Sequence, residues 1–402
     1  MRRPASWLPA LAAALISVVT LSATSASAVS EALAVTTTAT FNHPGGTATE
    51  QNRVRDHVVG LIDDAQPGTS ITVSMYTFTE DTVRNALLAA KDRGVSVKVI
   101  LDHTSATMTG GEYGNLAAGL GTDRTKSSWV LACPAQRGCI GSRALAADSD
   151  GTINHNKFFL FSQVGGANKV VVQTSANMTN LQRTDLFNNA VTIVDGGLYD
   201  LYQAYFADLL KYGTGAGLSH YYKTPSSGAY KTYFFPRQEA AGTEFNNDPS
   251  TDTVKLILDN VGCAGGTEVR MAANLFTRNA VAQRLVALKN AGCSVTLAHD
   301  GTPGAMGTVV ESTVSGKLTQ RVECYEDRGA GVAKAGLHSK YLLVKGVYDG
   351  VAGKKLVFAG SHNYTYPALR ANDETLLKID NAALYDQFKA NHDQLMSYCA
   401  GS

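Results

Sequence analysis

The chain has 402 residues, of which 44% are hydrophobic, with 35 basic and 34 acidic side chains. A chain of this length can form two domains with substantial cores. Its balanced charge argues against a dedicated nucleic-acid binder, which usually carries a basic excess, although a neutral total does not exclude a local basic cleft.

The first 28 residues have the pattern of an export signal. Two arginines precede a short apolar run at residues 8–19, and residues 26–28 form a small-x-small cleavage pattern before Val29. The apolar run is shorter than the roughly 20 residues that span a bilayer. We therefore expect residues 1–28 to be a signal peptide that is removed, and the mature protein to be secreted into the extracellular space.

An internal repeat divides the rest of the chain into two halves. Residues 61–102 and 256–300 both read as a turn, an apolar strand, an amphipathic helix, a glycine and a second apolar strand. Gly94 and Gly292 stand where a helix C-terminal cap belongs. Each copy predicts a right-handed βαβ unit with parallel strands. We expect an N-terminal half at 29–212, a connector at 213–250 and a C-terminal half at 251–402.

The second part of each half carries a His-x-Lys pair and then a Ser-x-Asn pair. These are His155/Lys157 with Ser175/Asn177, and His338/Lys340 with Ser361/Asn363. Residues two apart on a strand point to the same face, so each pair directs two polar groups to one place. If the halves face each other, the polar groups of both converge on one cleft.

This set of side chains suits cleavage of a phosphodiester. One neutral histidine can attack phosphorus, and the other, protonated, can give its proton to the leaving oxygen. Lysine and asparagine can hold the non-bridging oxygens as their charge changes. A single His-x-Lys pair is common, with a chance expectation of about 0.4 in a chain of this composition. Two pairs at matching places in a repeat favour function.

These units resemble the HxK…GSxN motifs of the phospholipase D superfamily, over nearly all of the mature chain. The resemblance implies an α/β fold of two similar halves about a pseudo-twofold axis, each with a central mixed sheet flanked by helices, and one active site at their interface. It implies that His155 and His338 are nucleophile and general acid, with His155 the expected nucleophile. It also implies phosphate binding by the other motif residues: Lys157, Lys340, Asn177 and Asn363, with Ser175 and Ser361 as substrate-binding residues. No metal or other cofactor is expected.

Three positions depart from the family pattern. Ser162 and Lys345 stand where an Asp usually follows the motif lysine, and Thr174 replaces the usual Gly before the first Ser-x-Asn, whereas Gly360 fits. The missing Asp at both places motivates an alternative in which the protein binds phosphate without catalysis.

The family also places a carboxylate after the Ser-x-Asn strand to orient a motif histidine. In the second half, Glu374 or Asp373 can do this for His338. The first half offers only Asn188 and Asn189 at the matching place. We therefore expect Glu374 to contact His338 and to make it the more basic histidine.

The leading function is a phospholipase D that hydrolyses a phospholipid head group through a phosphohistidine intermediate, with transfer to an added alcohol as a further activity. Such a protein would be a monomer with transient membrane-surface contact. A secreted, metal-independent nuclease is the main rival. An aromatic cluster in the connector, at Tyr230, Tyr233, Phe234 and Phe235, either touches lipid or, as we favour, packs against the halves. His362 is expected to point away from its neighbours Ser361 and Asn363.

Six cysteines in an exported chain favour disulfides. Cys263 precedes the first strand of the second βαβ unit and Cys293 begins its next strand, so the two lie at neighbouring strand ends within bridging distance. Cys133 and Cys139 flank a short Pro- and Gly-containing loop. The remaining pair, Cys324 and Cys399, would tie the C-terminal segment to the second half.

Overall fold

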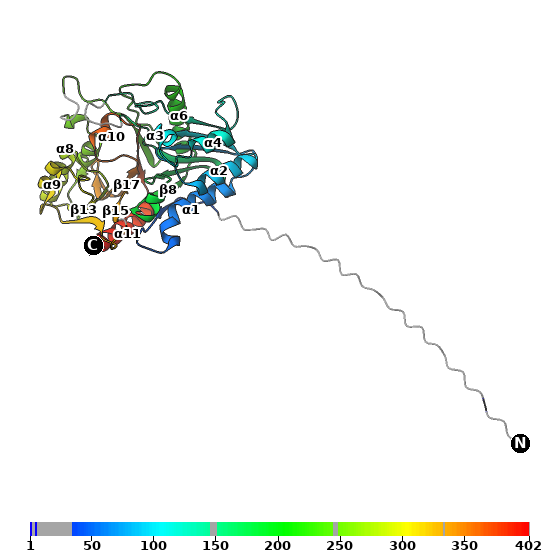
Figure 1. The fold of residues 1–402 in the computed structure, drawn as a ribbon. Helices are drawn as coiled ribbons and strands as arrows, with labels where there is room; N and C mark the ends of the chain where they lie inside the picture. The colour runs from blue at the N-terminus through cyan, green and yellow to red at the C-terminus, as the bar shows by residue number, and fades with distance from the viewer. Residues whose placement is uncertain (2–4, 6–33, 145–150, 244–247, 333, 402) are drawn as a thin grey trace. The chain divides into compact units, whose positions relative to one another are not determined.

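Two mixed β-sheets with helices on their outer faces make up the folded chain in this computed structural model (Figure 1). The structure describes Met1, Ala5 and residues 34–144, 151–243, 248–332 and 334–401. The expected export signal therefore lies almost wholly outside the described residues. Residues 33–402 form one compact unit, to which all that follows refers.

The first sheet has seven strands in the order β1-β8-β6-β5-β2-β3-β4. Strands β2, β3 and β4 are parallel, and the pairings of β1, β8, β6, β5 and β2 are antiparallel. The bounds are β1 Thr38–Phe41, β2 Ser70–Met75, β3 Ser96–Leu101, β4 Trp129–Ala132, β5 Lys157–Val164, β6 Ala167–Thr174 and β8 Asn189–Val194.

The second sheet repeats this plan and extends it. It runs in the order β7-β15-β14-β13-β12-β16-β17-β18-β10-β9, with β11 paired to β16. Strands β12, β13 and β14 are parallel, as β2, β3 and β4 are in the first half. The bounds are β7 Leu186–Phe187, β9 Ser226–Ser227, β10 Tyr230–Phe234, β11 Val261–Gly262, β12 Glu268–Ala273, β13 Ser294–Asp300, β14 Gln320–Glu326, β15 Ala335–Leu337, β16 Tyr341–Tyr348, β17 Val351–Gly360 and β18 Thr375–Asp380.

The helices begin and end where the local sequence provides caps. Thr47 and Glu50 form a capping box at the start of α1, and Asp195 and Asn381 cap α6 and α11 through their side chains. The bounds are α1 Ala48–Asp64, α2 Asp81–Asp92, α3 Thr104–Thr107, α4 Tyr113–Leu120, α5 Asn180–Thr184, α6 Gly196–Gly213, α7 Thr253–Asp259, α8 Asn279–Asn290, α9 Thr308–Val314, α10 Tyr366–Arg370 and α11 Ala382–Cys399, with a 3-10 turn at Pro249–Thr251.

The two predicted βαβ units are confirmed as β2-α2-β3 and β12-α8-β13. In both, the chain leaves the helix through a glycine with positive φ, +93° at Gly94 and +97° at Gly292. An L side chain rarely adopts this backbone conformation, which explains the glycine at both places.

Helices and sheets alternate in layers. Helices α1, α2 and α4 bury one face of the first sheet, and α7, α8 and α9 bury one face of the second. Between the sheets, α6 and α11 contribute aromatic and leucine side chains to a third core that includes strands of both halves. In Figure 1 the blue-to-green N-terminal half and the yellow-to-red C-terminal half lie side by side. The predicted fold of two similar α/β halves is therefore confirmed.

Strands from the N-terminal half and from the expected connector join the second sheet. Strand β7, from the N-terminal half, pairs in parallel with β15 of the second sheet. Strand β10, from the segment expected to be a connector, pairs with β18. Its aromatic cluster is buried, with exposed fractions of 8% or less at Tyr230, Tyr233, Phe234 and Phe235. These rings therefore pack within the protein and are not on a lipid-facing surface.

All three predicted disulfides are present: Cys133–Cys139, Cys263–Cys293 and Cys324–Cys399. Among the described helices, none has the length and apolarity needed to cross a membrane.

Candidate active site

The motif residues lie at the ends of the central strands, where the two halves meet. His155 precedes β5 and Lys157 begins it, and His338 and Lys340 directly precede β16. Ser175 and Asn177 follow β6, whereas Ser361 and Asn363 follow β17. All eight side chains are buried, including His155 (6% exposed) and His338 (9%). The sequence predicted both His-x-Lys units on strands, whereas the structure places both histidines in the segments that lead into β5 and β16.

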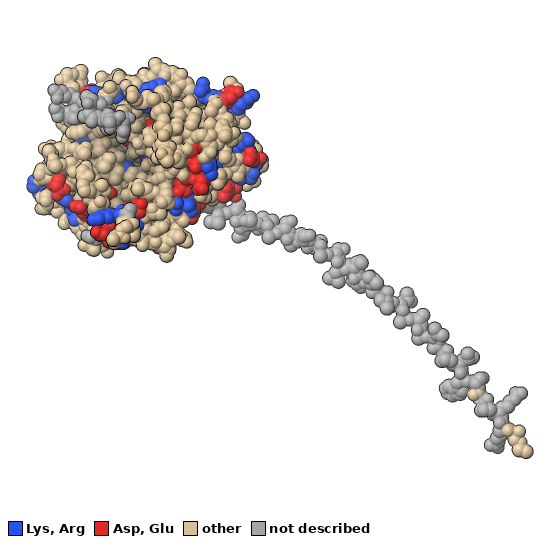
Figure 2. Space-filling view, in the orientation of Figure 1, with Lys and Arg blue, Asp and Glu red and all other residues tan. Residues whose placement is uncertain are grey.

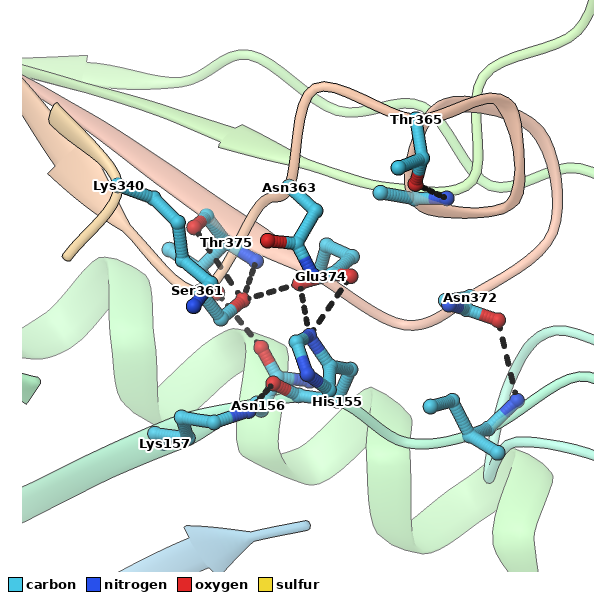
Figure 3. A network of polar contacts seen from close by, with 12 residues as sticks. His155, Asn156, Lys157, Lys340, Ser361, Asn363, Thr365, Asn372, Glu374 and Thr375 are labelled. Atoms are coloured by element: carbon cyan, nitrogen blue, oxygen red, sulfur yellow. Dashed lines mark hydrogen bonds and ion pairs between the residues drawn. The ribbon is translucent and has the colours of Figure 1, made fainter. Parts of the chain in front are cut away.

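The first histidine is held by the carboxylate of the other half. His155 Nδ1 lies 2.9 Å from Glu374 Oε1 and 3.0 Å from Oε2 (Figure 3). Ser361 Oγ donates to the same carboxylate at 2.5 Å. The expectation that Glu374 contacts His338 is therefore wrong. The two halves face each other, so that the segment after β17 lies against the turn before β5.

The second histidine has a neutral partner. His338 Nδ1 lies 3.0 Å from Asn188 Oδ1, and Ser175 Oγ donates to the same oxygen at 2.9 Å. The amide orientation is fixed because Asn188 Nδ2 donates to Gln182 O and Oε1, both at 3.0 Å. Asn188 Oδ1 can only accept, so His338 carries its proton on Nδ1 and presents Nε2 to the site.

The serines have matching roles in the two halves. Ser175 Oγ bonds Asn188 and accepts from Asn189 N at 3.0 Å, whereas Ser361 Oγ bonds Glu374 and accepts from Thr375 N at 3.0 Å. Each Ser-x-Asn serine thus orients the group that holds the histidine of the opposite half.

Both motif lysines fold back onto their own histidine segments. Lys157 Nζ donates to His155 O at 2.8 Å, and Lys340 Nζ donates to His338 O at 2.5 Å. Burial lowers the pKa of Lys157 to about 7 and that of Lys340 well below its usual value. A bound phosphate would reverse this effect, because an opposite charge favours the protonated amine.

Burial and the two lysines also set the protonation of the histidines. Burial lowers the pKa values of His155 and His338 well below 6.5, and Lys157 and Lys340 lower them further. Burial raises the pKa of Glu374 to about 8, which the two lysines oppose. We place the proton shared by this pair on His155 Nδ1, because the carboxylate accepts a hydrogen bond from Ser361, and this bond and the two lysines favour its ionised form. His155 then presents an unprotonated Nε2.

The asparagines leave polar groups directed to the site. Asn177 Oδ1 is buried and has no hydrogen-bond partner among the described residues. Asn363 Oδ1 accepts only a long bond from Leu275 N, at 3.4 Å. In Figure 3, Asn363 points toward Glu374 and Lys340. Both asparagines can therefore turn toward a bound phosphate without breaking a strong contact.

The positions of the missing Asp lie away from these groups. Ser162 Oγ accepts from Ser70 N at 2.8 Å, and Lys345 pairs with Glu268 at 3.0 Å. Five residues along a strand correspond to about 16 Å, so neither position reaches the histidines. The replacement of Asp there does not remove a group from the site, which weakens the reason for a non-catalytic function.

Sequence reasoning missed Tyr76, an aromatic neighbour of the site. The ring centroid of Tyr76 lies 5.1 Å from that of His155, and Lys157 Nζ lies 5.3 Å from the centre of the same tyrosine ring. His362 is buried against Phe235, at 4.3 Å between ring centroids, consistent with its expected orientation away from Ser361 and Asn363. Tyr76 follows β2 directly, and its position at a strand end was the only available signal.

The comparisons with known proteins agree with this geometry. A family model described as cardiolipin synthase, PLD-like domain, matches residues 58–210 and 259–396. The chain belongs to this phospholipase D family. The two matched regions lie within the two expected halves, and they contain both His-x-Lys and both Ser-x-Asn units. No curated protein matches the sequence.

Solved structures share the fold at low sequence identity. A phosphatidylserine synthase from Haemophilus influenzae Rd KW20 aligns with a TM-score of 0.53 and 12% identity, over 85% of this chain and 83% of that one. A polyphosphate kinase from Porphyromonas gingivalis aligns with a TM-score of 0.52 and 13% identity. The alignment covers 85% of this chain and about half (48%) of that enzyme. The phospholipase D family member Nuc from Salmonella typhimurium aligns with a TM-score of 0.32 and 20% identity, over 46% of this chain and 99% of that one. The first two likenesses show that this chain shares its overall fold with those two enzymes.

The described residues contain no group of three or more His, Cys, Asp or Glu side chains placed to hold a metal ion. The basic groups that face the site are lysines and histidines.

Proposed function

We propose that the protein is a phosphodiesterase that cleaves the head-group phosphodiester of a phospholipid through a phosphohistidine. The observation that carries this proposal is the pair of histidines held from opposite halves, His155 by Glu374 and His338 by Asn188, each beside a buried lysine. Both histidines keep Nε2 for the substrate. That is the arrangement that attack on phosphorus and protonation of a leaving oxygen require.

In the first step, His155 Nε2 attacks phosphorus and the bond from phosphorus to the head-group oxygen breaks. The negative charge of the bound phosphate raises the pKa of His338, so that the imidazole is protonated on both nitrogens. His338 gives its Nε2 proton to that oxygen, and the head group leaves as an alcohol. Glu374 supports His155 because the phosphorylated imidazole is positively charged while Nδ1 keeps its proton. The ammonium groups of Lys157 and Lys340 and the amides of Asn177 and Asn363 bind the non-bridging oxygens.

In the second step, a water molecule attacks phosphorus from the side that the head group has left. The now neutral His338 takes a proton from this water, and the P–N bond to His155 breaks to release the phosphatidate. An added alcohol in place of water would give head-group transfer by the same route.

A phospholipid suits the charge of the molecule better than a nucleic acid. Without the first 28 residues, 33 basic side chains stand against 34 acidic ones. On the face shown in Figure 2, the described acidic and basic residues are interspersed and the centre is largely uncharged. A nuclease needs a basic groove along its substrate, because phosphate neutralisation supplies most of its affinity. We therefore propose transient contact with a membrane surface and a monomeric, secreted protein. Three disulfides are consistent with an extracellular location.

The test is a parallel assay, with EDTA present, on vesicles of phosphatidylcholine, vesicles of phosphatidylethanolamine and plasmid DNA. We expect release of the head group from at least one lipid and an intact plasmid. The variants His155→Ala and His338→Ala should each lower turnover by about 10⁴-fold or more, as loss of a nucleophile or its partner does. Circular dichroism checks that both variants keep the fold.

Three outcomes would contradict the proposal. Cleavage of DNA without release from lipid would identify a nuclease. Turnover of either histidine variant within about tenfold of the parent would remove the assigned roles. Loss of activity with EDTA and recovery with added calcium or magnesium would exclude a metal-independent mechanism.

A further inference from the structure

The loop closed by the Cys133–Cys139 disulfide binds a carboxylate from the other half of the molecule. Asp373 is fully buried. Its two carboxylate oxygens accept hydrogen bonds from Ile140 N at 2.9 Å and from Gly141 N at 2.6 Å. No described Lys or Arg forms an ion pair with Asp373. The carboxylate is therefore held mainly by backbone amides, which form an anion-binding nest.

The shape of this nest depends on two glycines and on the disulfide. A Cβ atom at Gly138 would lie 2.7 Å from Asp373 Oδ2, and one at Gly141 would lie 2.1 Å from Ala371 O. Cys139 immediately follows the first of these glycines and is bonded to Cys133, six residues earlier. The disulfide thus keeps the loop closed at the point where it meets Asp373.

A neighbouring arginine fixes the same loop to the end of α6. Arg137 donates to Cys139 O at 2.9 Å and to Gly215 O at 2.7 Å. The nest is therefore anchored on the body of the N-terminal half, and Asp373 is a contact from the C-terminal half into it.

The backbone of Asp373 pairs with the segment that carries the first histidine. Asp373 N donates to Ile153 O at 3.0 Å, and His155 N donates to Asp373 O at 2.9 Å. The next residue, Glu374, directs its carboxylate to His155 Nδ1. Asp373, which the amide nest binds, is thus directly followed by Glu374, which orients His155. A shift of Asp373 therefore moves Glu374 as well.

Among the described residues, no comparable amide nest lies next to the partner of His338. Asn188 stands at the place of Glu374, since each is bonded by the Ser-x-Asn serine of its own half. The residue before it is Phe187, whose ring packs against His43 and Tyr398. Within the part of the chain that the structure describes, a buried carboxylate in a disulfide-closed loop lies next to the partner of His155 and not next to that of His338.

We propose that Asp373, held by the Cys133–Cys139 loop, is a positioning residue that sets Glu374 against His155. The disulfide is then part of the machinery of the site, and its reduction releases the contact between Glu374 and His155. The expected loss of kcat rests on the proposed function, whereas the expected loss of the contact between Glu374 and His155 does not.

The experiment compares two disulfides in the full-length secreted protein. Cys133→Ala/Cys139→Ala opens the nest, and Cys263→Ala/Cys293→Ala is the matched control, because that bridge lies at the outer end of β13, away from the site. The control closes 30 residues against 6, so the chain-entropy model expects it to cost more stability. We expect the first variant to lose about 10- to 100-fold in kcat with little change in KM, since a misplacement near 1 Å has that effect. The control should keep the parent kcat.

A measurement without substrate separates this inference from the proposed function. In protein with 15N-labelled histidine, the Nδ1 proton between His155 and Glu374 should give a downfield resonance, assigned by its loss in His155→Ala. We expect this resonance to be lost in Cys133→Ala/Cys139→Ala and to persist in the control. It should also be lost in Asp373→Asn, because the amide nitrogen would place a second donor against the backbone N–H groups. An unchanged resonance in the first two variants would overturn the inference even if the protein proves inactive on every substrate. Equal loss in both disulfide variants would overturn it too, as a general effect of stability.

Discussion

The two histidines of the site differ in the charge of their supporting group. Glu374 offers His155 a carboxylate oxygen at 2.9 Å, whereas Asn188 offers His338 a neutral amide oxygen at 3.0 Å. Both partners fix the proton on Nδ1, but only the carboxylate stabilises a positive imidazole. His338 is therefore the weaker base, which makes it a strong proton donor that is protonated only at lower pH. The site should work best on the acidic side of neutral.

Replacing the amide by a carboxylate should move the pH dependence in one direction. In Asn188→Asp the new negative charge raises the pKa of His338 by about one unit or more, so the acid stays protonated to higher pH. The alkaline limb of kcat/KM, which reports loss of that proton, should shift upward by the same amount. Glu374→Gln is the counterpart: it should lower turnover by acting on His155 and leave the alkaline limb in place. An unmoved alkaline limb in Asn188→Asp would show that His338 is not the acid.

At the scale of elements, the C-terminal helix is tied to the second sheet by a long covalent loop. The Cys324–Cys399 bridge joins β14 to the end of α11, 75 residues apart. Helix α11 packs between the two sheets, where Leu384, Tyr385 and Phe388 are fully buried or nearly so. The bridge therefore restricts an element on which the central core depends.

Removal of this bridge should lower stability more than removal of either of the others. For Cys324→Ala/Cys399→Ala the chain-entropy model gives a loss of about 4 kcal/mol, against roughly 2 kcal/mol for the short Cys133–Cys139 loop. Chemical denaturation followed by tryptophan fluorescence measures the midpoints of both variants. A larger loss for the short loop would show that strain or burial outweighs loop length.

The repeat in the sequence was enough to predict the elements that carry the site. Two βαβ units and three cysteine pairs follow from local spacing and from alignment of the halves. The two His-x-Lys units were predicted as well, although on strands and not in the segments that lead into them. Strand β10 was not predicted, because residues 230–234 acquire their strand partner only from β18, far along the chain. The connector region has no periodicity of its own to reveal this pairing.

The partner of each histidine could not be read from the sequence either. Alignment of the halves associates Glu374 with His338 of the same half, 36 positions away, whereas the structure places it on His155, 219 positions away. Which half supplies the partner depends on how the sheets face each other. That arrangement is a property of packing between α6, α11 and the strands, and no local pattern encodes it.

At the scale of the whole molecule, one chain supplies a complete site. Each half contributes one histidine and the support for the other histidine, and β7 crosses from the first half into the second sheet. We therefore expect a single chain to form the site without a second copy.

Mixing two inactive variants tests this description. His155→Ala and His338→Ala, combined in equal amounts and refolded together, should show no more activity than either alone, because every chain lacks one histidine of its only site. Size-exclusion chromatography should give a monomer for the parent. Recovery of a substantial part of the parent activity would indicate chains that exchange halves in a dimer.

The crossed support of the histidines has a consequence for biosynthesis. His155 is synthesised 219 residues before Glu374, the group that orients it, and Asn188 is synthesised 150 residues before His338. A ribosome has therefore made nearly the whole chain before either histidine acquires its partner. Products that end between His155 and Glu374 carry a histidine without its partner, so the proposed chemistry is available only to a chain that extends beyond Glu374 and has folded.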